Sequence, residues 1–233
     1  MPIACFAIGP MVSCLAGYSS TLGSQKMSFD PLPRDFFSHE PLVVARRLLG
    51  KRLVRCFEGK LFVGRIVEVE AYGGQEDSTS HAFRGARGRA MGLFGSVGHA
   101  YVYLIYGMYS CLNVVAHPAG GVGAVLIRAL APECGVEQMR SLRKGAPSHL
   151  LASGPGRLCN ALAIDRTFDG IDLCDQASPL YLAAGSAVPD TAVTAGPRIG
   201  VRGRPEDLVW PWRLFLADDP NVSPGRRRHS GSG

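Results

Sequence analysis

Residues 52–72, RLVRCFEGKLFVGRIVEVEAY, decide the fold class of this chain. They contain two strand-like runs, Arg52–Phe57 and Leu61–Tyr72, which the turn signal Glu58-Gly59-Lys60 separates. Two such runs around a short glycine-containing turn predict a β-hairpin. The sequence therefore predicts an antiparallel pair of strands, to which the further strands of a sheet can be added.

Further strand and helix signals lie on both sides of this hairpin. The strand signals occur at His99–Ile105, Cys111–His117, Ala124–Leu130, Leu180–Leu182, Arg198–Val201 and Arg213–Leu216. The helix signals occur at Pro41–Leu49 with Ser38 as its N-cap, at Gly135–Leu142, and from Ser153 to Leu162. Strands and helices do not alternate regularly, which favours the α+β class over a parallel β-α-β fold. We expect a single domain with a curved, mostly antiparallel sheet and short surrounding helices.

The composition is that of a globular protein with a basic charge balance. The 233 residues suit one domain, and 46% of them are hydrophobic, which is enough for a packed core. The formal net charge of +6 favours polyanionic partners such as nucleic acid or a membrane surface. No apolar run reaches the roughly 18–20 residues of a membrane helix. We expect residues 1–26 to form a disordered leader, residues 27–222 the folded domain, and residues 223–233 a flexible basic tail.

The seven cysteines bear on the cellular compartment and on metal binding. Their number is odd, their spacing is wide, and no Cys-x-x-Cys motif occurs. This pattern argues against a disulfide framework and against a zinc site, and it favours a reducing, intracellular compartment.

Two glutamates stand near the end of the second hairpin strand. Side chains alternate between the faces of a strand, so Glu68, Glu70 and Tyr72 are expected on one face. A carboxylate at a strand end, followed by Gly73-Gly74, is well placed to act as a general base on a water molecule. A surface strand with two solvated acids gives the same pattern, and residues 68–72 alone favour that second interpretation.

Four of the chain's seven tyrosines lie between Tyr101 and Tyr109. Tyr101 and Tyr103 are expected on one strand face, and Tyr106-Gly107 is typical of a turn that projects an aromatic ring outward. Such a cluster can stack nucleic-acid bases, at roughly 1–3 kcal/mol per base. It can equally line the edge of a core, so the two interpretations stay open.

A long polar segment, Gln75–Gly98, precedes the tyrosines and carries Arg84, Arg87 and Arg89 among glycines. A loop of this length inside a small domain is usually functional. Guanidinium groups on such a loop can bind phosphates, whereas a solvated loop is the alternative for any one arginine.

Taken together, these motifs resemble the alkyladenine (3-methyladenine, methylpurine) DNA glycosylase family. The resemblance extends from about Arg46 to about Val222. The matching segments are Arg47–Gly50, Gly64–Tyr72, Tyr101–Tyr109, Leu126–Leu130, Ser153–Cys159 and Pro197–Val201. Several motifs in the family's order and spacing make the resemblance specific, and it implies that residues 27–222 are the glycosylase catalytic domain.

The resemblance implies roles for three residues that act on the attacking water. Glu70 matches the glutamate that orients and deprotonates this water. Arg128 matches an arginine that helps to hold it, and Ile199 matches a position whose backbone carbonyl does so too. Glu68 shares the strand face with Glu70 but does not match the catalytic glutamate, so we expect it to be structural.

The resemblance also implies residues that contact the damaged base and the DNA. Tyr72, His81 and Tyr103 match the residues that sandwich the flipped base, and Asn113 matches a residue on the pocket floor. Tyr106 matches the tyrosine that enters the base stack. Met108 and Tyr109 match residues along the DNA groove.

The chain departs from the family pattern in the arginine loop. The family commonly has Arg-Asn shortly before a Met-Phe pair, whereas here Ala90 follows Arg89 and Leu93-Phe94 replaces the pair. Phosphate contacts by Arg84, Arg87 and Arg89 are therefore expected only as a group.

The function implied by the resemblance is that of a monofunctional DNA glycosylase. Such an enzyme flips an alkylated or deaminated purine out of duplex DNA, hydrolyses its N-glycosidic bond and leaves an abasic site for base excision repair. The resemblance implies double-stranded DNA as the partner, a monomer, no cofactor, no metal and no membrane, with action inside the cell at the DNA. Two other classes stay open from the residues alone: a non-catalytic nucleic-acid-binding protein with a tyrosine platform, and an RNA-binding or RNA-modifying domain.

Overall fold

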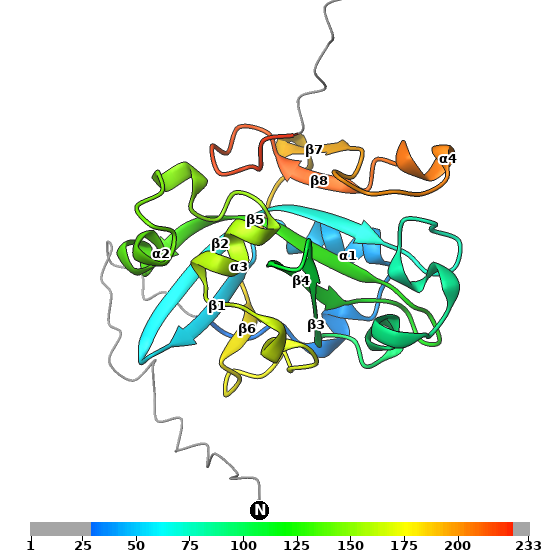
Figure 1. Cartoon of the computed structure of the whole chain (residues 1–233), viewed down its shortest axis with the longest axis horizontal. Helices are drawn as coiled ribbons and strands as arrows, with labels where there is room; N and C mark the ends of the chain where they lie inside the picture. The colour runs from blue at the N-terminus through cyan, green and yellow to red at the C-terminus, as the bar shows by residue number, and fades with distance from the viewer. Residues whose placement is uncertain (1–28, 226–233) are drawn as a thin grey trace, which may run out of the picture.

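A β-hairpin stands at the centre of the sheet in the computed structural model, which describes residues 29–225 (Figure 1). Strands β1 (Arg52–Phe57) and β2 (Lys60–Tyr72) pair antiparallel along the whole of β1. Glu58 and Gly59 form the turn between them, and their φ angles are 49° and 71°. Positive φ at both central residues is the geometry that two-residue hairpins prefer. The predicted hairpin is confirmed.

The remaining strands extend this hairpin into an eight-stranded antiparallel sheet in the order β3-β4-β5-β2-β1-β6, with β8 also paired to β2 and β7 to β8. The bounds are Ala100–Ile105 for β3, Tyr109–Val115 for β4, Ala124–Cys134 for β5, Leu180–Ala183 for β6, Val193–Gly196 for β7 and Arg213–Leu216 for β8. The C-terminal half of β2 has β5 on one edge and β8 on the other. The predicted α+β class, with one mostly antiparallel sheet, is confirmed.

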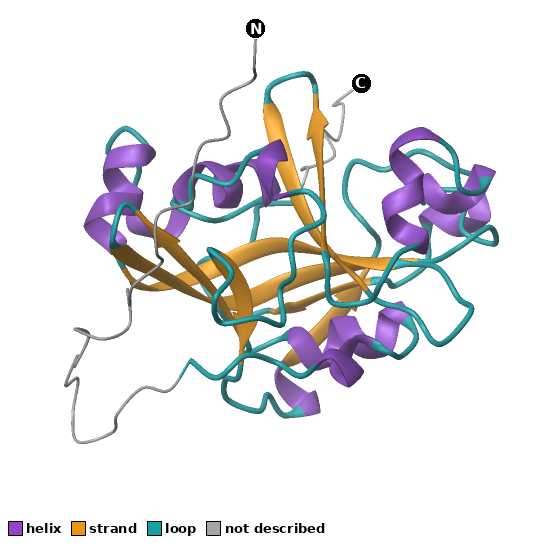
Figure 2. Ribbon diagram, turned by 90° about the horizontal axis from the view of Figure 1, so that it is seen from below, coloured by secondary structure: helices purple, strands orange, loops and turns teal. Residues whose placement is uncertain are grey.

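Short helices surround the strands, as Figure 2 shows. The α-helices are α1 (Pro41–Leu48), α2 (Val136–Leu142), α3 (Pro155–Ala161) and α4 (Pro205–Leu208). The 3-10 helices are η1 (Arg34–Phe37), η2 (His81–Arg84), η3 (Gly88–Phe94), η4 (Ser148–Leu150), η5 (Arg166–Phe168) and η6 (Asp190–Ala192). Helix α1 packs on β2 and β5, while α3 packs on β4 and β5. Their buried apolar side chains join those of the sheet in one core.

Two local predictions are wrong. Ser38 does not cap α1: the helix begins after Glu40, and Ser38 instead ends η1 by donating its backbone N–H to the carbonyl of Asp35. The segment Arg198–Val201 is not a strand, although its alternation of residues is typical of one. Instead, the Ile199 amide bonds to the Glu70 side chain, and the Arg198 side chain pairs with Asp77 in the loop after β2. Gly200 has a φ of 76°, which lies outside the extended region of a strand.

The predicted leader, residues 1–26, lies outside the described residues, and so does the tail from Arg226 onward. Ser223, which the sequence places at the start of that tail, is buried. Between residues 29 and 225, no helix combines the length and the apolar character needed to cross a membrane. Cys111, Cys134, Cys159 and Cys174 are free thiols. Cys56 is disulfide-bonded, whereas the cysteine pattern of the sequence argues against a disulfide framework.

Candidate active site

Glu70 is a fully buried carboxylate near the C-terminal end of β2. Its Oε1 accepts a hydrogen bond from the backbone N–H of Ile199 at 2.7 Å, and its Oε2 accepts one from the Tyr72 hydroxyl at 2.8 Å. Nη1 of Arg128 lies 3.2 Å from Oε1. An ionised carboxylate has about four acceptor positions. These contacts fix its orientation and leave a position on Oε2 for one more donor.

Glu68 lies on the same face of β2, two residues earlier, and is also fully buried. Its Oε1 accepts from Nε of Arg128 (3.0 Å), Nη1 of Arg213 (3.0 Å) and the hydroxyl of Ser223 (2.9 Å). Its Oε2 accepts from the backbone N–H of Ser223 at 2.7 Å. Four protein donors bind Glu68 and join β2, β5, β8 and the segment after β8, whereas three donors bind Glu70.

Arg128 contacts both glutamates from a β-bulge in strand β5. The β2–β5 register shifts between Glu68 and Val69, so that Arg128 on β5 has no direct partner on β2. A bulged residue of this kind changes the direction of its side chain. Burial opposes the charge of Arg128, but Glu70 and Glu68 outweigh that effect and hold the pKa of Arg128 above its ordinary value. The site therefore contains a permanent cation between two carboxylates.

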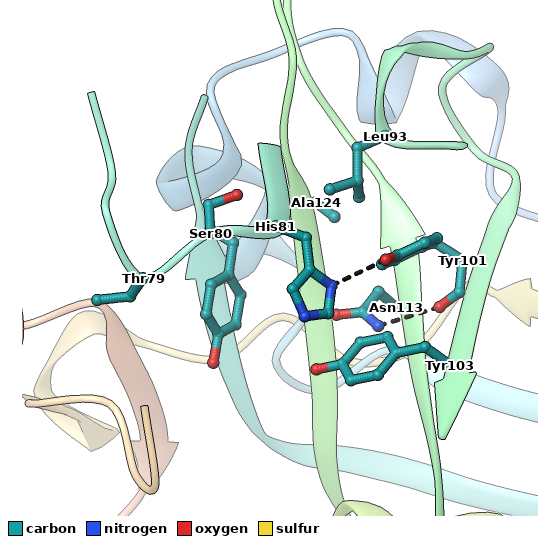
Figure 3. Close-up of a pocket in the computed structure, with 9 residues that line it drawn as sticks. Thr79, Ser80, His81, Leu93, Tyr101, Tyr103, Asn113 and Ala124 are labelled. Carbon is teal, nitrogen blue, oxygen red and sulfur yellow. Dashed lines mark hydrogen bonds between the residues drawn. The ribbon is translucent and has the colours of Figure 1, made fainter. Parts of the chain in front are cut away.

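Tyr72, which bonds to Glu70, also lines an aromatic pocket. Figure 3 shows this pocket. The rings of His81 and Tyr103 meet edge to face with centroids 4.6 Å apart, and Tyr101 and Tyr103 lie 5.4 Å apart. The Tyr101 hydroxyl lies 2.8 Å from Nδ1 of His81. The buried Asn113 donates its side-chain amide to the Tyr101 carbonyl at 3.0 Å. Tyr72 forms a further part of the wall, so the four residues predicted for a base pocket line one cavity.

This aromatic pocket continues into the cavity that contains Glu70. Tyr72 and Tyr103 line both. The second cavity, which we call the catalytic cavity, is also lined by Glu70, Ile105, Tyr106, Cys111, Leu126, Arg128, Pro155 and residues 199–202. Tyr72 and Tyr103 therefore connect the pocket that Asn113 lines with the cavity that Glu70 lines.

Burial keeps the polar groups of the pocket uncharged. It raises the pKa of Tyr72 well above its ordinary value, with Glu70 adding to the effect, so the phenol stays a hydrogen-bond donor. It raises the pKa of Cys111 to about 11. The His81 residue as a whole is exposed, yet partial desolvation still lowers its pKa, and the nearby charge of Arg89 lowers it further. At neutral pH the imidazole is therefore neutral, with one nitrogen as donor and the other as acceptor.

Tyr106 lies at the tip of the turn between β3 and β4. Its φ is 52° and that of Gly107 is 69°, so both residues occupy the left-handed region. This conformation costs a side chain other than glycine roughly 1–2 kcal/mol. Nevertheless the Tyr106 ring is 77% exposed at the rim of the catalytic cavity. Strain of this kind in an exposed aromatic residue is typical of a functional position.

The remaining predicted DNA contacts are exposed on two segments of the surface. Met108 is 67% exposed and Tyr109 is 41% exposed, on the same turn and the start of β4. Arg84, Arg87 and Arg89 are exposed on the segment that contains η2 and η3. Within the described part of the chain, these three arginines form no ion pair with a carboxylate. Only Arg89 acts on the pocket, through its charge on His81 and Tyr101.

Comparison with known proteins decides the family. The family model described as methylpurine-DNA glycosylase matches residues 35–220. The chain is 49% identical over 193 residues to a protein of Methanocella arvoryzae, covering 82% of this chain and 95% of that protein. It is 44% identical over 203 residues to a protein of Herpetosiphon aurantiacus, covering 86% and 91% respectively. Both are named "Putative 3-methyladenine DNA glycosylase".

The chain belongs to the methylpurine-DNA glycosylase family. It is therefore a hydrolase of the N-glycosidic bond, with DNA as its substrate and repair of alkylated bases as its role. Between residues 29 and 225 of this methylpurine-DNA glycosylase, no three His, Cys, Asp or Glu side chains converge as they would around a metal ion.

Sequence reasoning missed a buried network that supports the site of this methylpurine-DNA glycosylase. Nη1 and Nη2 of Arg198 donate to the two carboxylate oxygens of Asp77 at 2.6 and 3.1 Å, and Nη1 also donates to the Ala71 carbonyl at 3.0 Å. The guanidinium centre lies 5.0 Å from the centroid of the Tyr72 ring. Arg198 directly precedes Ile199, so this network positions both the amide and the phenol that hold Glu70. In the sequence, the Asp-Ser-Thr run after Glu76 is typical of a local turn, but it does not indicate that Asp77 pairs with Arg198.

Proposed function

We propose that this chain is a monofunctional DNA glycosylase that flips a damaged purine, alkylated or deaminated, out of the duplex. Glu70 then activates the water that hydrolyses the N-glycosidic bond, which leaves an abasic site for base excision repair. The observation that carries this proposal is the fixed, buried Glu70 carboxylate, which has an acceptor position left and lines the catalytic cavity next to the aromatic pocket. A positioned general base contributes roughly 10²–10⁴ to the rate.

The pocket chemistry supports recognition of alkylated purines. Alkylation gives the purine a positive charge, which the faces of Tyr72 and Tyr103 attract by about 0.5–2 kcal/mol. The neutral state of His81 avoids repulsion of such a cation. The same charge weakens the glycosidic bond, whereas a deaminated purine is neutral and needs a proton donor. We propose that Asn113, which lines the aromatic pocket, sets which purines fit.

The exposed Tyr106 supports a flipping mechanism. Moving a nucleotide out of the stack costs a few kcal/mol, less for a damaged or poorly paired base. A ring inserted into the vacated space restores part of the lost stacking. Met108 and Tyr109 lie beside Tyr106 on the same turn, where they would follow the groove. Arg84, Arg87 and Arg89 would add phosphate contacts on the η2–η3 side.

Arg128 and Ile199 complete the proposed machinery. Arg128 is held within the wall of the catalytic cavity by the two glutamates, where its charge would also orient the attacking water. The N–H of Ile199 is used on Glu70, so its carbonyl would be the group that holds this water. We further propose that the protein acts as a monomer on double-stranded DNA inside the cell, without a cofactor.

A single-turnover assay tests the proposal against its alternatives. Duplexes that contain 3-methyladenine or hypoxanthine are incubated with excess protein, and the released base is identified by mass. We expect the free damaged base and a strand with an abasic site. A non-catalytic binding protein would bind the same duplexes at the same salt concentration without releasing a base. Preferential binding and base release on a matched RNA duplex would favour the RNA-directed alternative.

A further inference from the structure

A second groove opens on the far side of Tyr106 from the aromatic pocket. It shares Ile105, Tyr106, Arg128 and Pro155 with the catalytic cavity, so the two hollows are continuous around the Tyr106 turn. Beyond these residues, the groove runs between the end of α2, helix α3 and the segment after β8. Its distinctive polar residues are Arg143, Arg157 and Asn160. The groove therefore begins where the catalytic cavity ends.

Two of these residues are cations without a carboxylate partner. Arg143 donates from Nε to the Leu151 carbonyl at 3.1 Å, and Arg157 donates from Nη1 to the Ser153 carbonyl at 3.2 Å. Within residues 29–225, neither of them forms an ion pair. Burial, and then the charge of Arg157, lower the pKa of Arg143. Two like charges in one groove repel each other until an anion lies between them.

The groove is rigid because of how its elements pack. Gly156 has no side chain, and a Cβ atom there would lie 3.1–3.2 Å from the Tyr109 side chain. Helix α3 therefore packs closely against Tyr109, the first residue of β4, and it does so at Gly156, the residue before Arg157. Arg143 is the C-cap of α2, and its backbone N–H bonds to the Met139 carbonyl. The two guanidinium groups are thus attached to fixed backbones, which reduces the entropy lost when a ligand binds.

We propose that this groove binds a phosphodiester group of the DNA strand next to the flipped nucleotide, between the guanidiniums of Arg143 and Arg157. The proposal rests on the function proposed above and adds a binding site to it. In Figure 1, α2 and α3 lie on one side of β3 and β4, while the η2–η3 segment lies on the other. The arginines of the η2–η3 segment and this pair would therefore hold the duplex on both sides of Tyr106. A planar guanidinium suits a phosphate because it donates two parallel hydrogen bonds.

The first arm of the test measures affinity for a lesion duplex as a function of salt. Arg157→Gln and Arg143→Gln remove one contact each, so we expect the dissociation constant to rise about tenfold at moderate salt. The slope of log K against log salt should become shallower by about 0.9 per variant. Arg140→Gln is the matched control, because Arg140 lies on α2 but pairs with Glu137 outside the groove. Its slope should equal that of the wild type.

The second arm locates the phosphate on the DNA. Each phosphate near the lesion is replaced in turn by a neutral methylphosphonate, and binding of the wild type is compared with that of Arg157→Gln. We expect one position at which the replacement weakens the wild type about tenfold and the variant by less than twofold, because both changes remove the same contact. Arg157→Lys, which keeps the charge, should retain most of the sensitivity at that position.

Three results would overturn the proposal: a salt slope unchanged in both glutamine variants, an equal effect of Arg140→Gln, or methylphosphonate losses that are the same in wild type and variant. Absence of base release from the wild type would contradict the proposed function instead. The binding data would still decide the phosphate site, because they do not depend on turnover.

Discussion

The backbone amide of Ile199 donates a 2.7 Å hydrogen bond to Oε1 of Glu70, although the two residues are 129 positions apart. Arg198, the residue before Ile199, donates two hydrogen bonds to the Asp77 carboxylate in the loop after β2. The position of the Glu70 carboxylate therefore depends on a buried ion pair that does not contact it. This dependence leads to the first prediction.

Asp77→Ala should lower the free energy of unfolding by about 3–5 kcal/mol, because it leaves the buried charge of Arg198 unpaired. The exposed fractions of the two side chains are 0% and 1%. Replacing both residues with apolar ones, Asp77→Leu and Arg198→Met, should cost less than Asp77→Ala alone. Urea denaturation of the three proteins checks this order. A loss below about 1 kcal/mol for Asp77→Ala would contradict a stabilising role of the buried pair.

Tyr106→Asn should stabilise the protein and impair base flipping. Asparagine accepts the left-handed conformation at φ 52° more readily than tyrosine, so we expect the unfolding free energy to rise by about 0.5–1 kcal/mol. The fluorescence of a 2-aminopurine next to the lesion should report a lower flipped fraction. Tyr106→Phe is the control, since it keeps both the ring and the strain. A flipped fraction equal to the wild type in Tyr106→Asn would rule out insertion of this ring.

The pKa of His81 should lie below the ordinary histidine value of 6.5. The lowered pKa means that the folded protein prefers the neutral imidazole. This contribution to stability is fully present above pH 6.5 and is lost as the pH falls through the lowered pKa, because the unfolded chain takes up the proton first. An NMR titration with His81→Gln for assignment measures the value directly. A pKa above 6.5 would contradict the desolvated environment described for His81.

The sheet and one face of the site could be predicted from the sequence because they depend on local signals. Glu58 and Gly59 mark a turn whose geometry follows from two residues. Period-two alternation placed Glu68, Glu70 and Tyr72 together, and the structure shows Tyr72 bonded to Glu70.

The rest of the site depends on contacts between distant segments. The residues Arg198–Val201 alternate like a strand, yet the amide of Ile199 bonds to a side chain and Arg198 is buried in an ion pair. The distinction between the two glutamates also needs the tertiary structure, because the groups that saturate Glu68 come from β5, β8 and residue 223. No periodicity within one segment carries that information.

The failed cap at Ser38 has a similar cause. Serine is a favoured N-cap residue, and a proline follows it within one helical turn. Ser38 instead ends the preceding 3-10 helix with φ −85° and ψ 42°, not the extended backbone of an N-cap, and α1 begins only at Pro41, whose missing N–H needs no partner. Competition between two adjacent short helices decided the boundary.

Removal of the charge at position 70 is the most direct test of the central claim, and it is measured as the single-turnover rate of base release from a 3-methyladenine duplex. Glu70→Gln keeps the size and one acceptor oxygen, so we expect the lesion affinity to stay within a fewfold of the wild type. The rate should fall by about 10²–10⁴, which is the contribution of a general base. Base release at the wild-type rate in Glu70→Gln, with intact binding, would contradict the assignment of Glu70 as the group that activates water.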